Sequence, residues 1–333
     1  MSGQIKRIGV LTSGGDAPGM NAAVRAVVRC AISQGMECIG IRRGWNGLIT
    51  GDFAPMTASS ASHIITRGGT ILYTARSMEF MEPEGREKAL GTCKLLGLDG
   101  IVAIGGDGTF RGALALSRQA AEHGMDLQVV GIPATIDNDI GCSDYTIGFD
   151  TACNTALECV DKLRDTMQSH ERCSIVEVMG RHAGYLALTV GLAAGATAVL
   201  IPERPLDLEK DLIEKIRRAR LAGSTHYMIV TAEGVGSASE IAKYVQEQVG
   251  LDPRVTVLGH IQRGGTPSSR DREVASRMGH EAVMSLLENR GNRVIVSRDS
   301  HIKDMDMEEA LRMVKPFPME QYQILEDLSN IRA

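Results

Sequence analysis

The sequence predicts an α/β protein built on mainly parallel sheet. Short apolar runs alternate along the 333 residues with longer amphipathic segments, which is the pattern of repeated βαβ units. Hydrophobic residues make up 43% of the chain and aromatic residues only 4%. We therefore expect an aliphatic core, as packed α/β layers usually have.

The predicted strands are the short apolar runs, and the predicted helices are the amphipathic segments between them. The strands span residues 5–11, 37–41, 100–104, 128–132, 173–178, 197–201, 227–231, 255–258 and 294–297. The helices span residues 20–33, 110–123, 151–167, 183–193, 208–221, 240–250 and 271–288. No internal repeat and no Ser/Pro-rich linker occurs, so composition marks no hinge between domains.

Composition argues against several classes of protein. The net charge of −5 disfavours a general nucleic-acid surface. No apolar run reaches the roughly 18 residues that span a bilayer, and the first residues lack the apolar stretch of a signal peptide. The seven cysteines form no CxxC pair. We expect a reduced, cytoplasmic protein without a disulfide framework or a zinc site.

Three junctions share one design: a strand, then glycine with polar residues, then an Ala-rich helix start. They lie at residues 8–28, 101–116 and 175–188. A helix N-terminus carries unpaired N–H groups and a partial positive charge, and glycine lets the backbone approach an anion closely. Any βα turn favours glycine, but three such junctions in one chain predict a polyphosphate site.

The second junction contains GGDGT, Gly105 to Thr109, directly after a predicted buried strand. Its glycines leave room for a triphosphate, Asp107 can hold Mg²⁺ beside phosphate oxygens, and we expect Thr109 at the helix N-cap. The chain contains no GxxxxGK[ST], no HRD or DFG, and no GxGxxG at its first helix. GGDGT also occurs in lipid and NAD kinases, so alone it predicts only a nucleotide-kinase-like site.

The sequence PATIDND, residues 133–139, follows the next strand along the chain. Because the carboxyl ends of parallel strands meet at one edge of a sheet, where ligands bind, we expect this turn near GGDGT. Asp137 is then placed to take a proton from an attacking hydroxyl, and Asp139 to organise the metal end. A solvated acidic loop is the alternative.

Basic residues follow the later strands. In and near the motifs VEVMGRHAG and VTVLGHIQRGG lie Arg172, Arg181, Arg254, His260 and Arg263. Arginine pairs with phosphate through a planar fork, so this group predicts a phosphorylated small-molecule ligand. A surface salt bridge, or a structural imidazole for His260, is the alternative for each residue alone.

As a set, these motifs resemble those of bacterial ATP-dependent 6-phosphofructokinases. LTSGGDAPGMNAAVR, RGGT with TAR, IGGDGT, PATIDNDI, DYTIGFDTA, VEVMGRHAG and VLGHIQRGGTP follow one another in that family's order and cover nearly the whole chain. The resemblance implies two similar doubly wound domains with the active site in the cleft between them. It implies an ATP-binding domain of residues 1–148 and 262–311, and a sugar-phosphate-binding domain of residues 149–261 and 312–333.

The resemblance also implies a reaction, the transfer of the γ-phosphoryl group of Mg-ATP to the 1-hydroxyl of fructose 6-phosphate. The residues implied to contact ATP are Gly15, Arg76, Ser77, Gly106, Asp107, Gly108 and Thr109, with Asp107 the magnesium position. Asp137 would be the general base and Thr135 would contact the phosphoryl group in flight. Asp139 would support the metal side, and Arg181 would stabilise charge in the transition state.

The sugar phosphate would be held by a further group of residues, Met179, Gly180, Glu233, His260 and Arg263, together with Thr135, Asp137 and Arg181. Arg172 and Arg254 would reach the 6-phosphate from a neighbouring subunit. The resemblance thus implies an allosteric, cytoplasmic homotetramer with shared active sites, and neither nucleic acid nor membrane as a partner.

The chain departs from the family pattern at the donor and effector sites. Pyrophosphate-dependent members resemble GGDDT and PKTIDND. Gly108 here matches the ATP form, whereas Ala134 is neither the Gly of that form nor the Lys of the other. Four residues match the family's effector site: Arg25, Arg29, Arg164 and Gly195. Where that site carries charged residues, this chain has Ala58, His63, Thr197 and Ser224.

Two alternatives stay open on these grounds. One is a transferase that uses pyrophosphate, or that acts on another sugar phosphate such as sedoheptulose 7-phosphate. The other is a catalytically silent homologue that binds nucleotide as a regulatory subunit. Such a homologue should have lost the base or the metal position, but Asp107, Asp137 and Arg181 are all present.

Overall fold

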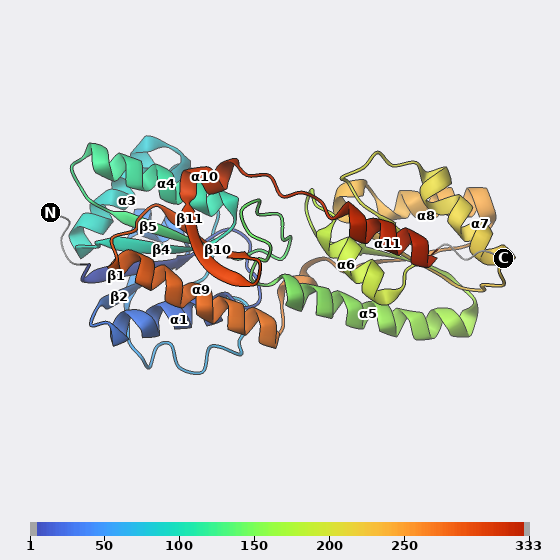
Figure 1. The fold of residues 1–333 in the computed structure, drawn as a ribbon, viewed down its shortest axis with the longest axis horizontal. Helices are drawn as coiled ribbons and strands as arrows, with labels where there is room; N and C mark the ends of the chain where they lie inside the picture. The colour runs from blue at the N-terminus through green and yellow to red at the C-terminus, as the bar shows by residue number, and fades with distance from the viewer. Residues whose placement is uncertain (1–4, 330–333) are drawn as a thin grey trace. The chain divides into compact units, whose positions relative to one another are not determined.

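The computed structural model describes residues 5–329 and confirms the α/β fold class, with two compact units (Figure 1). Unit 1 comprises Met1–Thr135, Ile140–Asp150 and Arg263–Lys315. Unit 2 comprises Ile136–Asp139, Thr151–Gln262 and Pro316–Ala333. The outer ends of the two predicted domains, residues 1–4 and 330–333, lie outside the described residues.

Unit 1 contains a seven-stranded sheet in the order β11-β10-β5-β4-β1-β2-β3. Its strands are β1 (Arg7–Thr12), β2 (Glu37–Ile41), β3 (Phe53–Met56), β4 (Gly100–Gly105), β5 (Gln128–Pro133), β10 (Arg293–Arg298) and β11 (His301–Asp306). The inner strands run parallel, and β3 and β11 add an antiparallel strand at each edge.

Helices cover both faces of this sheet (Figure 1). On one face, α1 (Met20–Ser33) packs against α9 (Ser269–Leu287). The other face carries α2 (Trp45–Thr50), the short η1 (Glu79–Met81), α3 (Pro83–Leu96), α4 (Asp107–Glu122) and α10 (Met307–Arg312). Phe110 of α4 is 1% exposed and lies over β5, where a Cβ on Gly131 would stand 2.6 Å from its ring.

The order of the inner strands creates a topological switch point in unit 1. Strands β1 and β4 are neighbours, but β1 leads to β2 on one side while β4 leads to β5 on the other. Helices therefore leave the carboxyl ends of β1 and β4 in opposite directions, and ligands of doubly wound sheets bind in the crevice that this leaves. The turns after β1 and β4 are the first two glycine-rich junctions of the sequence.

Unit 2 contains a four-stranded parallel sheet in the order β7-β8-β6-β9. The strands are β6 (Cys173–Val178), β7 (Ala198–Leu200), β8 (Tyr227–Ala232) and β9 (Arg254–Val257). A core of aliphatic residues lies under η2 (Glu209–Ile213), α7 (Glu214–Leu221) and α8 (Ala238–Val249). Helices α6 (Tyr185–Ala194) and α11 (Met319–Ser329) lie side by side (Figure 1).

The remaining elements of unit 2 are α5, η3 and η4. Helix α5 (Phe149–His170) begins in the last residues of unit 1 and continues in unit 2. The short η3 (Glu233–Val235) follows β8 directly, and η4 (Gly259–Arg263) follows β9. Within residues 5–329, no helix is both long and apolar enough to cross a membrane.

Every predicted strand and helix has a counterpart in the structure, and β2, β6 and α1 have the predicted bounds. The predicted helix over residues 208–221 divides into a π-helical turn, η2, and α7. The predictions omitted the edge strands β3 and β11, and also α2, α3, α10 and α11. The expected N-cap at Thr109 is wrong, because α4 begins at Asp107 with Gly106 as its cap.

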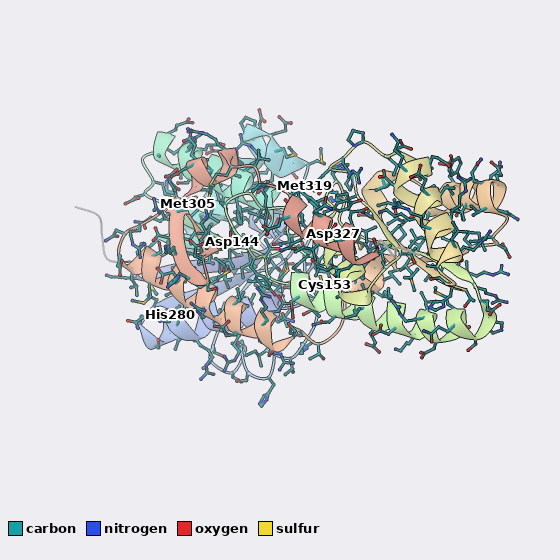
Figure 2. All side chains as sticks on the ribbon, turned by 45° about the vertical axis from the view of Figure 1, so that its right-hand side comes forward. Asp144, Cys153, His280, Met305, Met319 and Asp327 are labelled. Atoms are coloured by element: carbon teal, nitrogen blue, oxygen red, sulfur yellow. The ribbon has the colours of Figure 1, made fainter. Side chains whose placement is uncertain are left out.

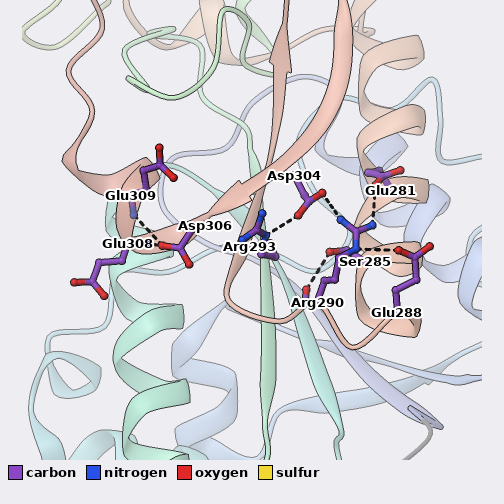
Figure 3. A network of polar contacts seen from close by, with 9 residues as sticks. All are labelled: Glu281, Ser285, Glu288, Arg290, Arg293, Asp304, Asp306, Glu308 and Glu309. Carbon is purple, nitrogen blue, oxygen red and sulfur yellow. Dashed lines mark hydrogen bonds and ion pairs between the residues drawn. The ribbon is translucent and has the colours of Figure 1, made fainter. Parts of the chain in front are cut away.

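A network of charged side chains holds the hairpin of β10 and β11 (Figure 3). Arg293 Nε donates to Asp304 at 2.6 Å, and Arg290 donates to Asp304, to Glu288 at 2.9 Å and to Glu281 at 3.4 Å. Burial alone would raise the pKa of Asp304, but the hydrogen bonds from the two arginines lower it below its ordinary value. Charged side chains on an edge strand generally disfavour pairing with the edge of another sheet.

Candidate functional site

The turns after β1 and β4 are joined directly by hydrogen bonds. Ser13 N donates to Ile104 O at 2.9 Å, and Thr109 Oγ1 donates to Ser13 O at 3.2 Å. Gly105 lies where the turns meet, and a Cβ there would stand 2.3 Å from Ser13 O and 2.4 Å from Thr109 Oγ1. These distances exclude any side chain at position 105, so the two turns can approach each other only across a glycine.

The other glycines of GGDGT border open space. A Cβ on Gly106 or Gly108 would meet no described atom within 4 Å, so packing does not explain why these residues are glycines. Gly106 has extended backbone at the N-cap of α4 and provides no side-chain cap. Thr109 N and Phe110 N both donate to Gly106 O, at 2.9 and 3.2 Å, so α4 begins directly after this glycine with the exposed Asp107 in its first turn. The N-terminal end of this 16-residue helix carries a partial positive charge that favours an anion.

The side chains of Arg263 and Thr74 contact the backbone of the turn after β1. Arg263 Nη1 donates to Asp16 O at 3.0 Å, and a Cβ on Gly15 would stand 2.4 Å from the same nitrogen. Thr74 Oγ1 donates to Gly14 O at 2.6 Å. The second bond ties the segment that carries the exposed Arg76, and Ser77 beside it, to the first turn.

The end of β5 lies beside the end of β4, as we expected for PATIDND. Ala134 N donates to Gly105 O at 3.0 Å, and Ala134 is 1% exposed. Thr135 O accepts a hydrogen bond from Thr146 Oγ1 at 2.6 Å. Unit 1 thus brings together the ends of β1, β4 and β5, whereas the third glycine-rich junction, residues 175–188, belongs to unit 2.

Asp137 and Asp139 occupy different surroundings although one residue separates them. Asp137 is 7% exposed, whereas Asp139 is only partly buried. Asn138 between them has a φ of 51°, a left-handed conformation that asparagine tolerates better than most residues. A simple solvated acidic loop would not bury Asp137, so this turn is built for something other than solubility.

Negative charge gathers around Asp139 within unit 2. Burial, followed by the charges of Glu203 and Asp139, raises the pKa of Tyr185 to about 12. Burial also raises the pKa of Glu203, although its carboxylate accepts a hydrogen bond from Gly184 N at 2.7 Å. A cation would be stabilised in such surroundings.

The turn that leaves β6 is held by side chains from the strands on both sides. Glu233 Oε1, just after β8, accepts from Gly180 N at 3.2 Å and from Arg181 N at 2.6 Å. Gln262 Oε1, after β9, accepts from Met179 N at 2.9 Å. The structure therefore brings together Met179, Gly180, Arg181 and Glu233 of the predicted sugar-phosphate group.

Three further residues of the predicted site, His260, Arg172 and Arg254, are exposed in unit 2. His260 lies in η4, after the carboxyl end of β9. Arg172 precedes β6, and Arg254 begins β9 with an ion pair to Asp252 at 3.0 Å. Strands β6 and β9 are parallel. Arg172 and Arg254 therefore lie at the amino ends of these strands, whereas Met179 and His260 follow their carboxyl ends. Within one chain, the structure does not bring these two groups together.

The predicted effector residues fall into two groups. Arg25 and Arg29 lie on α1 in unit 1. In unit 2, Arg164 on α5 donates to Ala194 O, next to Gly195, which ends α6 in a left-handed conformation. Ala58 borders a groove of about 340 Å³ whose other lining residues are mostly apolar, among them Ile32, Met36 and Met56.

A cavity of about 530 Å³ in unit 2 contains none of the predicted site residues. It lies between η2, α7 and α11, and Figure 2 labels Met319 and Asp327, which mark the first and last turns of α11. Ion pairs join Arg204 to Asp211 at 3.0 Å and Lys215 to Glu326 across it. The charges lining this cavity are largely neutralised by one another.

A magnesium ion is compatible with the donor atoms at the turn after β4. Across residues 5–329, no cluster of three or more His, Cys, Asp or Glu side chains forms a metal cage. Mg²⁺ usually keeps several waters and binds one or two carboxylates together with substrate phosphates. Asp107, exposed at the N-terminus of α4, is one such carboxylate.

Ser13, Thr74 and Gln262 were missing from the predicted site, although they contact its residues. Ser13 and Thr74 lie inside quoted motifs, LTSGGD and TAR, but they act through backbone contacts that a motif does not reveal. Gln262 lies in GHIQRGG between His260 and Arg263, where a neutral amide gave no indication of chemistry. Only the tertiary structure shows what these three residues contact.

Comparisons with a family model and with curated relatives point to the same protein family. The phosphofructokinase family matches residues 7–286 of this chain. The ATP-dependent 6-phosphofructokinases of Clostridium botulinum strain Loch Maree and Alkaliphilus metalliredigens strain QYMF are each 50% identical to it, over 326 and 325 residues. Each alignment covers 98% of this chain and 100% of the relative.

Solved structures share the fold. The phosphofructokinase of Saccharomyces cerevisiae has a TM-score of 0.86 and 35% identity, and the match covers 97% of this chain and 47% of the yeast chain. This chain thus spans about half the length of the yeast subunit. A pyrophosphate-dependent phosphofructokinase from Marinobacter aquaeolei has a TM-score of 0.86 at 22% identity, over 99% of this chain and 93% of that chain, which shows the common fold alone. The match over most of the chain, together with full-length bacterial relatives at 50% identity, shows that this protein belongs to the phosphofructokinase family.

Proposed function

We propose that this protein is an ATP-dependent 6-phosphofructokinase of glycolysis. It would transfer the γ-phosphoryl group of ATP to the 1-hydroxyl of fructose 6-phosphate, giving fructose 1,6-bisphosphate and ADP. One observation carries the proposal: two glycine turns meet at a switch point and leave open space before the N-terminus of α4. The full-length relatives named for this activity support the same reaction.

The nucleotide is assigned to unit 1. The triphosphate would lie against the turns at Gly15 and Gly106 to Thr109, where backbone N–H groups and the dipole of α4 favour anions. Arg76 and Ser77 follow Thr74, which fixes their segment to the first turn. Mg²⁺ at Asp107 would neutralise phosphate charge and orient the transferring group.

The acceptor is assigned to the residues after β5, β6, β8 and β9. Asp137 would accept the proton of the sugar 1-hydroxyl, and its burial keeps water from competing for that role. Thr135 would contact the phosphoryl group during transfer, with Asp139 on the metal side. Arg181 would stabilise the charge that develops in transfer. Met179, Gly180, Glu233, His260 and Arg263 would hold fructose 6-phosphate.

Arg172 and Arg254 support an assembly rather than a single chain. Both are exposed at the sheet edge opposite to His260 and Met179, so they can serve a sugar phosphate only in a neighbouring subunit. We therefore propose a homotetramer with shared active sites. We also propose a cytoplasmic location, because glycolytic substrates are found there.

The alternative donor, pyrophosphate, is less well supported. Gly108 borders open space, where the pyrophosphate form would place a carboxylate, and the buried Ala134 brings no charge to the end of β5. A silent regulatory homologue is disfavoured because Asp107, Asp137 and Arg181 are retained.

The substitution Asp137→Ser tests the general base. It should leave fructose 6-phosphate and ATP binding nearly unchanged but lower kcat by at least about 10³-fold, because a positioned base and its charge are removed. Glu247→Gln on the exposed side of α8 is the matched control and should retain full activity. Steady-state kinetics with a coupled assay decide the matter, and more than a tenth of wild-type kcat in the serine variant would show that Asp137 is not the base.

Donor choice can be tested at Gly108. The wild-type protein should have a higher kcat/KM for ATP than for pyrophosphate with fructose 6-phosphate and Mg²⁺. Because position 108 is open, Gly108→Asp should fold normally but lower kcat/KM for ATP by about 100-fold through repulsion of the triphosphate. Gly91→Asp on α3 is the control for added charge. A wild-type preference for pyrophosphate would contradict the proposed donor.

Regulation should be weak. The groove beside Ala58 is mainly apolar, and Glu37 is its one charged lining residue in the part of the chain that is described. Thr197 and Ser224 have uncharged side chains, so they offer no charge to an anionic effector. Each charged hydrogen bond contributes about 1.5–3 kcal/mol, so losing several should greatly weaken binding of ADP or phosphoenolpyruvate.

Saturation curves for fructose 6-phosphate, with and without millimolar ADP or phosphoenolpyruvate, measure this regulation. We expect half-saturation to shift by less than about twofold, compared with the 5–150-fold that is typical of allosteric coupling. A larger shift with either compound would show that Arg25, Arg29 and Arg164 suffice for an effector site.

A further inference from the structure

The exit turn of β6 depends on two side chains for three consecutive backbone hydrogen bonds. Strand β6 lies between β8 and β9 in its sheet. Glu233 accepts from Gly180 N and Arg181 N on the side of β8, and Gln262 accepts from Met179 N on the side of β9. Neighbouring strands therefore hold the turn from both sides.

The backbone of this turn needs such support. Gly180 has a φ of 142° and Arg181 a φ of 59°, and an arginine persists in the left-handed region only where its surroundings fix it. The turn is also closed by Ala183 N, which donates to Gly180 O at 2.9 Å, and a Cβ on Gly180 would stand 2.3 Å from Ala183 O. Loss of one anchor would let the turn relax toward ordinary backbone angles.

Gln262 is buried in a way that stability alone does not explain. Its side chain is 0% exposed, and its Nε2 has no hydrogen-bond partner among the described residues. A buried donor without a partner destabilises the folded state. A methionine of similar length would avoid that penalty and would lose only the bond to Met179 N. The atom of Gln262 that explains its presence is therefore Oε1, which accepts the hydrogen bond from Met179 N.

We infer that Gln262 is a positioning residue for phosphoryl transfer, which acts through Met179 to set the backbone of Gly180 and Arg181. The inference rests on the proposed function, in which Met179 and Gly180 hold the sugar phosphate and Arg181 stabilises developing charge. Complete burial keeps Gln262 itself from contact with substrate. Glu233 performs the same task from the other side of β6.

Kinetics of Gln262→Met test the role in the reaction. Relative to wild type, the variant should raise KM for fructose 6-phosphate and lower kcat, each by about tenfold, with KM for ATP changed by less than about twofold. Asp211→Ala is the matched control, because Asp211 is also buried in unit 2 and accepts a backbone N–H, that of Asp207 at 2.9 Å. This control should lower thermal stability without changing either KM.

Hydrogen exchange measured by mass spectrometry tests the anchor without any need for activity. The peptide covering residues 178–184 should exchange at least about tenfold faster in Gln262→Met, while peptides of α8 and α11 stay as in wild type. Gln262→Glu keeps an acceptor oxygen at the same distance along the side chain. It should restore the slow exchange of this peptide to within about twofold of wild type.

The two measurements separate the possible failures. Unchanged exchange in Gln262→Met, or equally fast exchange in Gln262→Glu, would overturn the anchor. Fast exchange with unchanged kinetics, or equal increases in both KM values, would overturn the positioning role. If the wild-type protein did not phosphorylate fructose 6-phosphate, the proposed function would fall, and with it the link to phosphoryl transfer, while exchange would still decide the anchor.

Discussion

The approach of two backbone turns across Gly105 is the constraint on which the proposed nucleotide site depends. Thr109 Oγ1 can reach Ser13 O only because no side chain lies between them. That contact fixes the start of α4 beside the turn after β1. The end of β5 is held in the same place because Ala134 N donates a hydrogen bond to Gly105 O. Three strand ends are thus positioned by one residue without a side chain, and Gly106 and Gly108 border open space at the N-terminus of α4.

In unit 2, the turn after β6 is held in place by side chains. Glu233 and Gln262 accept the N–H groups of the turn after β6, so the conformation of Arg181 depends on residues far away in sequence. Asp137 and Asp139 have different surroundings although only Asn138 separates them. Asn138 takes a left-handed conformation, Asp137 is buried, and Asp139 is only partly buried and contributes to the raised pKa of Tyr185. The two carboxylates of this turn therefore differ in their exposure to solvent.

The parallel strands and the glycine turns could be predicted because both are local. A strand buried on both faces reads as a continuous apolar run, as VVGI before PATIDND does. The edge strands could not be recognised: β3 contains Pro55, and β11 reads HIKDMD, in which Lys303, Asp304 and Asp306 carry charge. Both features suit an edge strand and hide it from a search for apolar runs.

Most residues of the candidate site could be named from motifs, but their contacts could not. Thr109 looked like a helix cap, whereas its hydroxyl bonds to the backbone of Ser13, 96 residues away in sequence. Gln262 carries no charge and was passed over between His260 and Arg263. Its contact with Met179 depends on the order β8-β6-β9, and strand order is a property of the whole sheet.

The dissociation constant of Mg-ATP from Gly105→Ala, measured by isothermal titration calorimetry, tests the account most directly. Gly91→Ala on α3 is the control, because a Cβ there meets no atom of the described residues within 4 Å. The account predicts that the added methyl group separates the turns after β1 and β4. It should weaken ATP binding at least about 100-fold, or about 2.7 kcal/mol, in a variant that keeps the wild-type circular dichroism spectrum. Gly91→Ala should bind ATP as the wild type does. An unchanged dissociation constant in Gly105→Ala would contradict the claim that the approach of the two turns creates the nucleotide site.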